Sequence, residues 1–108
     1  MKRIERNNSI VKVLSSKNIK LTGSAYLAEI SNRYEYKTMC LEEIRFEFNG
    51  EEYEIDHCWL QQMDYPAYFR KQAEENRLYY FEFTFYPYRD AIDRDGMHGM
   101  DVSFIEPY

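Results

Sequence analysis

Apolar and polar residues alternate most clearly over residues 39–48 and 51–60, on either side of Asn49-Gly50. This pattern is typical of two antiparallel strands joined by a two-residue type I′ turn. The turn length fixes which residues face each other across the hairpin. The register pairs Phe46 with Tyr53 and Ile44 with Ile55 on an apolar face, and Arg45 with Glu54, Glu47 with Glu52 and Glu43 with Asp56 on a charged face.

The same register would bring Glu42 and His57 onto the apolar face, which predicts a β-bulge near residues 41–43. His57 and Trp59 are two residues apart on one strand, so we expect them to share its inward face. One interpretation is a hydrogen-bonded histidine beside a packed tryptophan. The alternative is the wall of a pocket.

Three further segments predict strands. Residues 78–88 alternate strictly, so we expect the odd positions from 79 to 85 to face the core and the even positions to face outward. Residues 19–31 predict one long strand in which Gly23 marks a bulge or a sharp bend. A last strand is expected at about residues 100–105.

Two segments predict helices. In residues 9–16, Ser9 is a candidate N-cap and the apolar residues share one helical face, although the β-branched residues leave a strand open as the alternative. Residues 65–75 predict a helix with Asp64 as its N-cap and Pro66 in its first turn, where a missing N–H is tolerated.

The predicted order of elements is β-β-β-α-β-β, with a possible short helix in front. This order, with a bent first strand and short connections, is that of an OB-like β-barrel, so we expect a mainly β fold. A small open α+β sandwich is the competing interpretation. We expect residues 1–18 to form an N-terminal extension and residues 19–108 to form the barrel domain.

The composition is that of a folded domain. The chain has 108 residues, of which 44% are hydrophobic and 31% are charged, and this excludes a disordered chain. No apolar run reaches the ~18 residues that a membrane-spanning helix needs, and we expect no signal peptide and a cytoplasmic location. Cys40 and Cys58 are then expected to be buried, reduced thiols, since secreted domains of this size more often carry four or more cysteines.

Charge is distributed unevenly along the chain. Residues 1–37 carry eight Lys and Arg against three Glu, whereas the rest carries six against sixteen Asp and Glu. The segment from Glu42 to Asp56 alone contains seven carboxylates and one arginine. A nucleic-acid-binding face is usually basic, so only the N-terminal third offers one.

The sequence contains no pattern that predicts catalysis, a metal or a cofactor. It lacks the usual spacings of zinc ligands, the glycine-rich phosphate loops and the nucleophile turns. His57 and Cys58 are adjacent on a strand and point to opposite faces, so they do not form a nucleophile–base pair. We therefore expect a non-catalytic protein with no cofactor and no bound metal.

Three short motifs carry a resemblance. They are Asp56-His57-Cys58-Trp59 at the end of a strand, Tyr86-Pro87-Tyr88, and residues 101–107 in the last strand. Together they resemble small, largely uncharacterised OB-like proteins of Gram-positive bacteria and their phages. The resemblance implies an OB-like barrel and a phage or mobile-element origin, and it implies no catalytic residues.

Our main expectation for function is a module that binds a protein partner and does not bind membranes. Carboxylates of the hairpin would supply charge complementarity, and outward tyrosines would supply contact area. In a phage context such a module could mimic nucleic acid and inhibit a nucleic-acid-handling host protein, as anti-defence proteins do. The alternative for these residues is a solvated surface. The expected partner-binding residues are Glu43, Glu47, Glu51, Glu52, Glu54, Asp56, Tyr80 and Tyr86.

The second expectation is an OB-fold that binds single-stranded nucleic acid. Basic side chains would follow the backbone and tyrosines would stack on bases. The residues expected for this role are Lys20, Arg33, Tyr34, Tyr36, Lys37, Tyr86 and Arg89.

Overall fold

The protein folds into one six-stranded sheet with short helices at its ends. The computed structural model describes residues 1–32, 37–88 and 96–108. The sheet order is β1-β4-β3-β2-β5-β6, and every neighbouring pair is antiparallel except β1–β4. The elements are β1 (Lys2–Ile4), α1 (Ser9–Ser16), β2 (Leu21–Ser31), β3 (Thr38–Phe48), β4 (Glu51–Leu60), the 3₁₀-helix η1 (Gln62–Asp64), α2 (Phe69–Gln72), β5 (Arg77–Pro87) and β6 (His98–Pro107).

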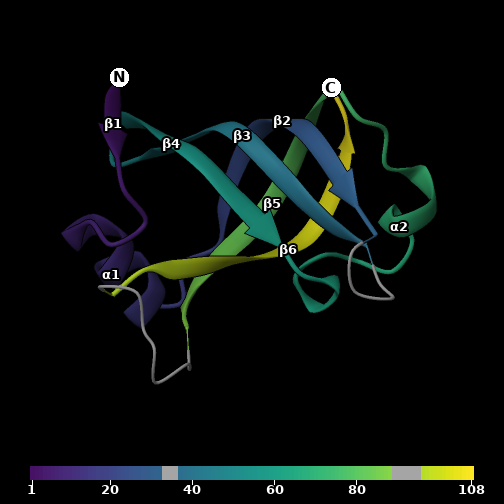
Figure 1. The fold of residues 1–108 in the computed structure, drawn as a ribbon. Helices are drawn as coiled ribbons and strands as arrows, with labels where there is room; N and C mark the ends of the chain where they lie inside the picture. The colour runs from purple at the N-terminus through teal and green to yellow at the C-terminus, as the bar shows by residue number, and fades with distance from the viewer. Residues whose placement is uncertain (33–36, 89–95) are drawn as a thin grey trace.

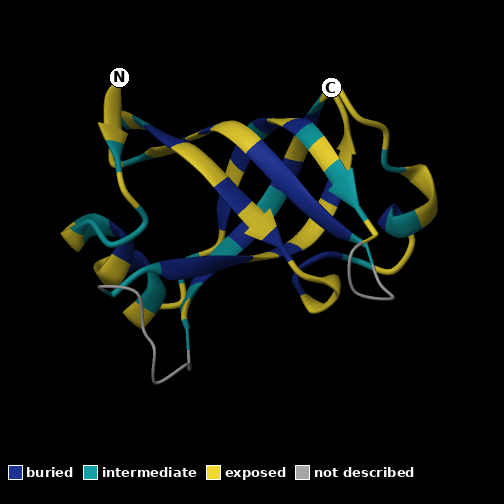
Figure 2. Cartoon of the chain, viewed as in Figure 1, coloured by how far each residue is buried: buried dark blue, intermediate teal, exposed yellow. Residues whose placement is uncertain are grey.

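The sheet curves around a single apolar core, and α1 and α2 lie at its opposite ends (Figure 1). Buried and exposed positions alternate along its central strands (Figure 2), as the sequence predicts for residues 78–88. Residues 1–18 share in this architecture, because β1 pairs with β4 and α1 contributes Val11 and Leu14 to the core. In the described ranges, no helix is both long and apolar enough to cross a membrane.

The β3–β4 hairpin has the register that its turn predicts, from Met39 opposite Leu60 to Phe48 opposite Glu51. The predicted bulge is also confirmed. Glu43 has a φ of 52°, and the pairing of β3 with β2 shifts register beside it. Because of this shift Glu42 and Glu43 are both exposed, and Glu42 does not enter the core.

The expectation that His57 and Trp59 face the core is wrong. Both are exposed, whereas Ile55, Cys58 and Leu60 are buried. The inward-facing positions of β4 therefore change opposite the bulge, from the odd-numbered Ile55 to the even-numbered Cys58 and Leu60. The simple alternation rule fails because the bend affects both strands.

The two predicted helices differ in outcome. The helix at residues 9–16 is confirmed, although its N-cap is Asn8 and not Ser9, since Asn8 Oδ1 accepts from the Ile10 N–H at 3.0 Å.

The helix predicted for residues 65–75 shrinks to the four residues of α2. Tyr65 is extended, with φ −139° and ψ 157°, because the following Pro66 disfavours a helical residue before it. Asp64 therefore ends η1, where its carboxylate accepts from the Gln61 N–H in a capping box, and it does not cap α2.

The sheet is open between β4 and β6. In the described residues these strands lie against each other without a hydrogen-bonded ladder. Among the described residues, other groups bond to the free edge of β6 at two points. Arg6 and His98 bond to each other in both directions, and the Tyr68 hydroxyl bonds to the N–H and C=O of Ile105. We call this line of contact between β4 and β6 the seam.

Candidate partner-binding groove

The outward face of the sheet is hollowed along β2, because the outward residues of this central strand, Thr22 and Ser24, are small. Ser24 lies between Tyr80 of β5 and Arg45 of β3. The short side chains of β2 therefore form a floor that longer side chains flank on both sides. Two shallow hollows of about 200 and 280 Å³ follow one another along the strand, and both contain Ser24, Arg45 and Tyr108 in their linings. We call this surface the β2 groove.

Carboxylates form one wall of the β2 groove. Glu47 and Glu52 line the first hollow, and Glu43 lines the second. Glu47 and Glu52 lie directly opposite each other on β3 and β4. Like charges in this position repel. Within the described part of the chain, no basic group lies within 4.0 Å of either carboxylate.

Among the described residues that line the groove, Arg45 is the only basic one, and it is bonded to Glu54. Its Nε lies 3.0 Å from Glu54 Oε1, and this hydrogen bond raises the pKa of Arg45. Glu54 is itself only 5% exposed and also contacts Arg3 Nε at 2.9 Å. One carboxylate is thus shared by two arginines, and attraction to Glu43 and Glu52 raises the pKa of Arg45 further, so Arg45 partly offsets the charge of these two wall glutamates.

Tyrosines form the opposite wall. The rings of Tyr80 and Tyr108 stack with centroids 4.3 Å apart and planes 8° apart, and they are 42% and 66% exposed. Their hydroxyls are 3.4 Å apart, and this hydrogen bond raises the pKa of Tyr80. Tyr26, also 42% exposed, lines the second hollow. The groove therefore places exposed aromatic rings opposite carboxylates that form no ion pair with any described basic residue.

The structure brings together half of the expected partner-binding residues. Glu43, Glu47, Glu52 and Tyr80 all line the groove. The other acidic positions lie elsewhere: Glu51 is 3.8 Å from Lys2, Glu54 is buried between two arginines, and Asp56 bonds to His57 beside β1.

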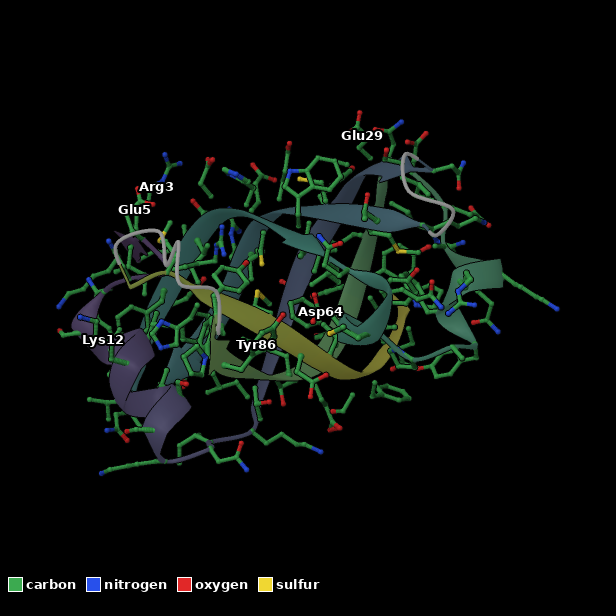
Figure 3. The ribbon with its side chains drawn as sticks, turned by 60° about the horizontal axis from the view of Figure 1, so that its bottom comes forward. Arg3, Glu5, Lys12, Glu29, Asp64 and Tyr86 are labelled. Carbon is green, nitrogen blue, oxygen red and sulfur yellow. The ribbon has the colours of Figure 1, made fainter. Side chains whose placement is uncertain are left out.

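Tyr86 does not belong to this surface. It is only partly exposed, and its hydroxyl donates to Asp64 Oδ1 at 2.7 Å on the seam (Figure 3). Burial, followed by this bond, raises the pKa of Tyr86. Tyr86 therefore does not line the β2 groove, and its expected role in partner binding stays a prediction.

The residues expected to bind nucleic acid do not form a described surface. Arg33, Tyr34, Tyr36 and Arg89 lie outside the described residues. Lys20 is exposed just before β2, while Lys37 lies beyond the other end of β2 and donates to the Arg70 carbonyl. Nucleic-acid binding by these residues stays a prediction.

Two residues of the groove were not singled out from the sequence. Tyr26 follows Thr22 and Ser24 in an alternating pattern, so its outward position was readable. Tyr108 follows the last strand, and no periodicity places it. Its position depends on the hydrogen bond from its N–H to the Leu78 carbonyl at 3.0 Å.

A larger cleft of about 460 Å³ is lined by β1, the turn that follows it and β4. It carries both signs of charge, and its arginines already have partners: Arg3 contacts Glu54, and Arg6 donates to Tyr88 and to the His98 carbonyl. The described residues contain no group of three or more His, Cys, Asp or Glu that could hold a metal ion. We therefore assign no chemistry to this cleft.

The two cysteines are not poised as nucleophiles. Both are free and buried, as the sequence predicts. Burial raises the pKa of Cys40 and of Cys58 to about 11. Both are therefore thiols at neutral pH, and it is the thiolate that reacts.

Comparisons with family models, with curated proteins and with solved structures found no match to this chain.

Proposed function

We propose that the protein is a non-catalytic binding module whose β2 groove takes a positively charged segment of a protein partner. One observation carries the proposal: glutamates that form no ion pair with any described basic residue face exposed tyrosine rings across a groove. Exposed tyrosines supply much of the binding energy at protein interfaces. An acidic surface attracts basic partners and speeds their association.

We also propose that residues 19–108 form an OB-like barrel that is left open at the seam. The order β4-β3-β2-β5-β6, with β2 paired to both β3 and β5, supports this assignment. OB-folds are partly open barrels that bind ligands on the face of their second and third strands. In this chain those strands correspond to β3 and β4, which carry the acidic wall.

The charge of the groove favours a protein over a nucleic acid. A phosphate backbone bound there would lie against Glu43, Glu47 and Glu52, and phosphate contacts normally supply most of the affinity for nucleic acid. The partner that fits this charge is one with a basic surface. A nucleic-acid-handling protein that this chain inhibits by mimicking nucleic acid remains our proposal for its class.

Fluorescence anisotropy tests this function with labelled probes of opposite charge. We expect the protein to bind nona-arginine and nona-lysine peptides at low salt, with affinity that falls as salt rises. We expect it not to bind a labelled 20-nucleotide single strand. The double charge reversal Glu47→Lys/Glu52→Lys should abolish peptide binding.

A matched reversal locates the site. Glu5 and Glu29 are exposed and line neither hollow of the groove (Figure 3). Glu5→Lys/Glu29→Lys changes the net charge by the same amount and should leave most of the binding in place. Equal losses in both variants would show that net charge alone attracts the peptides. Binding of the single strand in preference to the peptides would replace the proposal with nucleic-acid binding.

A further inference from the structure

The first hollow of the β2 groove has the features of a binding site for one particular side chain. We infer that it binds an arginine guanidinium of the partner, between the carboxylates of Glu47 and Glu52 and the ring of Tyr80. This inference rests on the proposed function and names the group that the groove recognises. It follows from the floor, the acidic wall and the aromatic wall of the hollow.

In the described part of the chain, neither glutamate of the first hollow forms an ion pair. Glu47 and Glu52 face each other across the β3–β4 ladder, and Arg45, which interacts electrostatically with Glu52, is bonded to Glu54. The repulsion between the two glutamates is present in the free protein and is relieved when a cation lies between them. A guanidinium presents five N–H donors in a flat fork, so it can bond to both carboxylates at once.

The aromatic wall favours a flat cation over a compact one. Tyr80 and Tyr108 stack face to face, which covers one face of each ring, and they remain 42% and 66% exposed, so ring surface is left for a further contact. A guanidinium stacks on such a ring, whereas a lysine ammonium is strongly hydrated and cannot stack. The floor of Thr22 and Ser24 is low enough to leave space beside the rings.

The test compares two peptides of equal charge. We expect nona-arginine to bind the protein about two- to fivefold more tightly than nona-lysine, which is the range for an exposed cation–π contact. Tyr80→Ala should remove this preference. Tyr80→Phe should keep it, because the phenylalanine ring still offers a face without the hydroxyl.

The carboxylates are tested separately, with their charge removed and not reversed. Glu47→Gln/Glu52→Gln should weaken nona-arginine binding by about fivefold or more, while Glu5→Gln/Glu29→Gln should change it by less than about twofold. Circular dichroism and thermal melting establish that each variant is folded. In two-dimensional NMR spectra, added nona-arginine should shift the ring signals of Tyr80 and Tyr108 more than those of the exposed Tyr68.

The outcomes separate this inference from the function on which it rests. If both peptides bind equally well and the Tyr80 variants make no difference, the inferred guanidinium site is wrong. The proposed binding of basic segments by the β2 groove is not contradicted by that result. If neither peptide binds at low salt, the proposed function and the inference both fall. An arginine preference that persists in Tyr80→Ala would place the guanidinium elsewhere and overturn the inference.

Discussion

Tyr86 extends across the neighbouring strand, and a glycine makes this possible. Tyr86 pairs with Gly99 of β6, and a methyl group built on Gly99 would lie 2.5 Å from Cζ of the ring. The ring therefore lies directly over the β6 backbone, and its hydroxyl reaches Asp64 beyond it. Three residues from separate elements thus fix the spacing of β5, β6 and η1, and Figure 3 labels two of them, Tyr86 and Asp64.

Gly99→Ala should therefore destabilise the protein. The new methyl group displaces the Tyr86 ring, which costs about 1–3 kcal/mol for overpacking, and the displaced hydroxyl leaves a buried carboxylate with one donor fewer. Urea unfolding measures the loss.

The control is the same substitution in a Tyr86→Ala background. There the ring is gone, so adding the methyl group to Gly99 should cost much less. Equal costs in both backgrounds would show that the ring does not depend on the glycine.

Asp64 should make stability depend on pH. Burial raises its pKa, and the donors on Tyr86 and Gln61 offset only part of that rise. The folded state therefore holds this proton more tightly than the unfolded chain does. The stabilisation is complete below the ordinary aspartate pKa of about 3.9 and is lost as pH rises through the higher folded value.

Chemical denaturation at several pH values between about 3 and 7 isolates this contribution, when the wild type is compared with Asp64→Asn. We expect the stability of the wild type relative to the variant to fall as pH rises over this range. A difference that is independent of pH, or that grows in favour of the wild type, would contradict the assignment.

At the scale of elements, the edge of β6 is closed by side chains in place of a strand. Tyr68, which precedes α2, both donates to the Ile105 carbonyl and accepts from the Ile105 N–H, each at 3.0 Å. Its hydroxyl thus takes the two positions that a neighbouring strand would fill. Unpaired edges invite pairing with other chains, so this contact also protects the protein from association.

Tyr68→Phe should open this edge with little loss of overall stability. Water can replace the hydroxyl, because Tyr68 is 44% exposed, so we expect a cost of about 0.5–1.5 kcal/mol. The Ile105 amide should exchange its hydrogen markedly faster, while that of Phe83 in the middle of β5 should not change. Unchanged exchange at Ile105 would show that the hydroxyl does not protect this edge.

At the scale of the whole molecule, features that depend on neighbouring residues could be predicted from the sequence, whereas contacts between distant segments could not. Asn49-Gly50 fixed the hairpin register, and the impossible burial of Glu42 predicted the bulge at Glu43. The apolar spacing of residues 65–75 predicts too long a helix, because Pro66, itself a local signal, disfavours a helical conformation at Tyr65. The sheet pairing of β1 and the position of Tyr108 depend on contacts between distant segments, which periodicity does not encode.

The candidate site could likewise be predicted only in part. The acidic hairpin was recognisable by composition, but composition does not show which carboxylates are neutralised. Glu54 is balanced by Arg3, which is distant in the sequence, whereas Glu47 and Glu52 have no such partner within the described part of the chain. The groove itself depends on the order of strands, because the small residues of β2 form a floor only between β3 and β5.

The seam also bears on the order of folding. Arg6 and His98 are 92 positions apart, so their contact carries one of the largest loop-closure costs in the chain, whereas the β3–β4 hairpin closes through two residues. During synthesis β6 emerges after every other strand. Until then Gly99 has not passed beneath Tyr86, and Asp64 remains in water. The nascent chain can thus assemble its hairpin early, and it buries this carboxylate only when the last strand arrives.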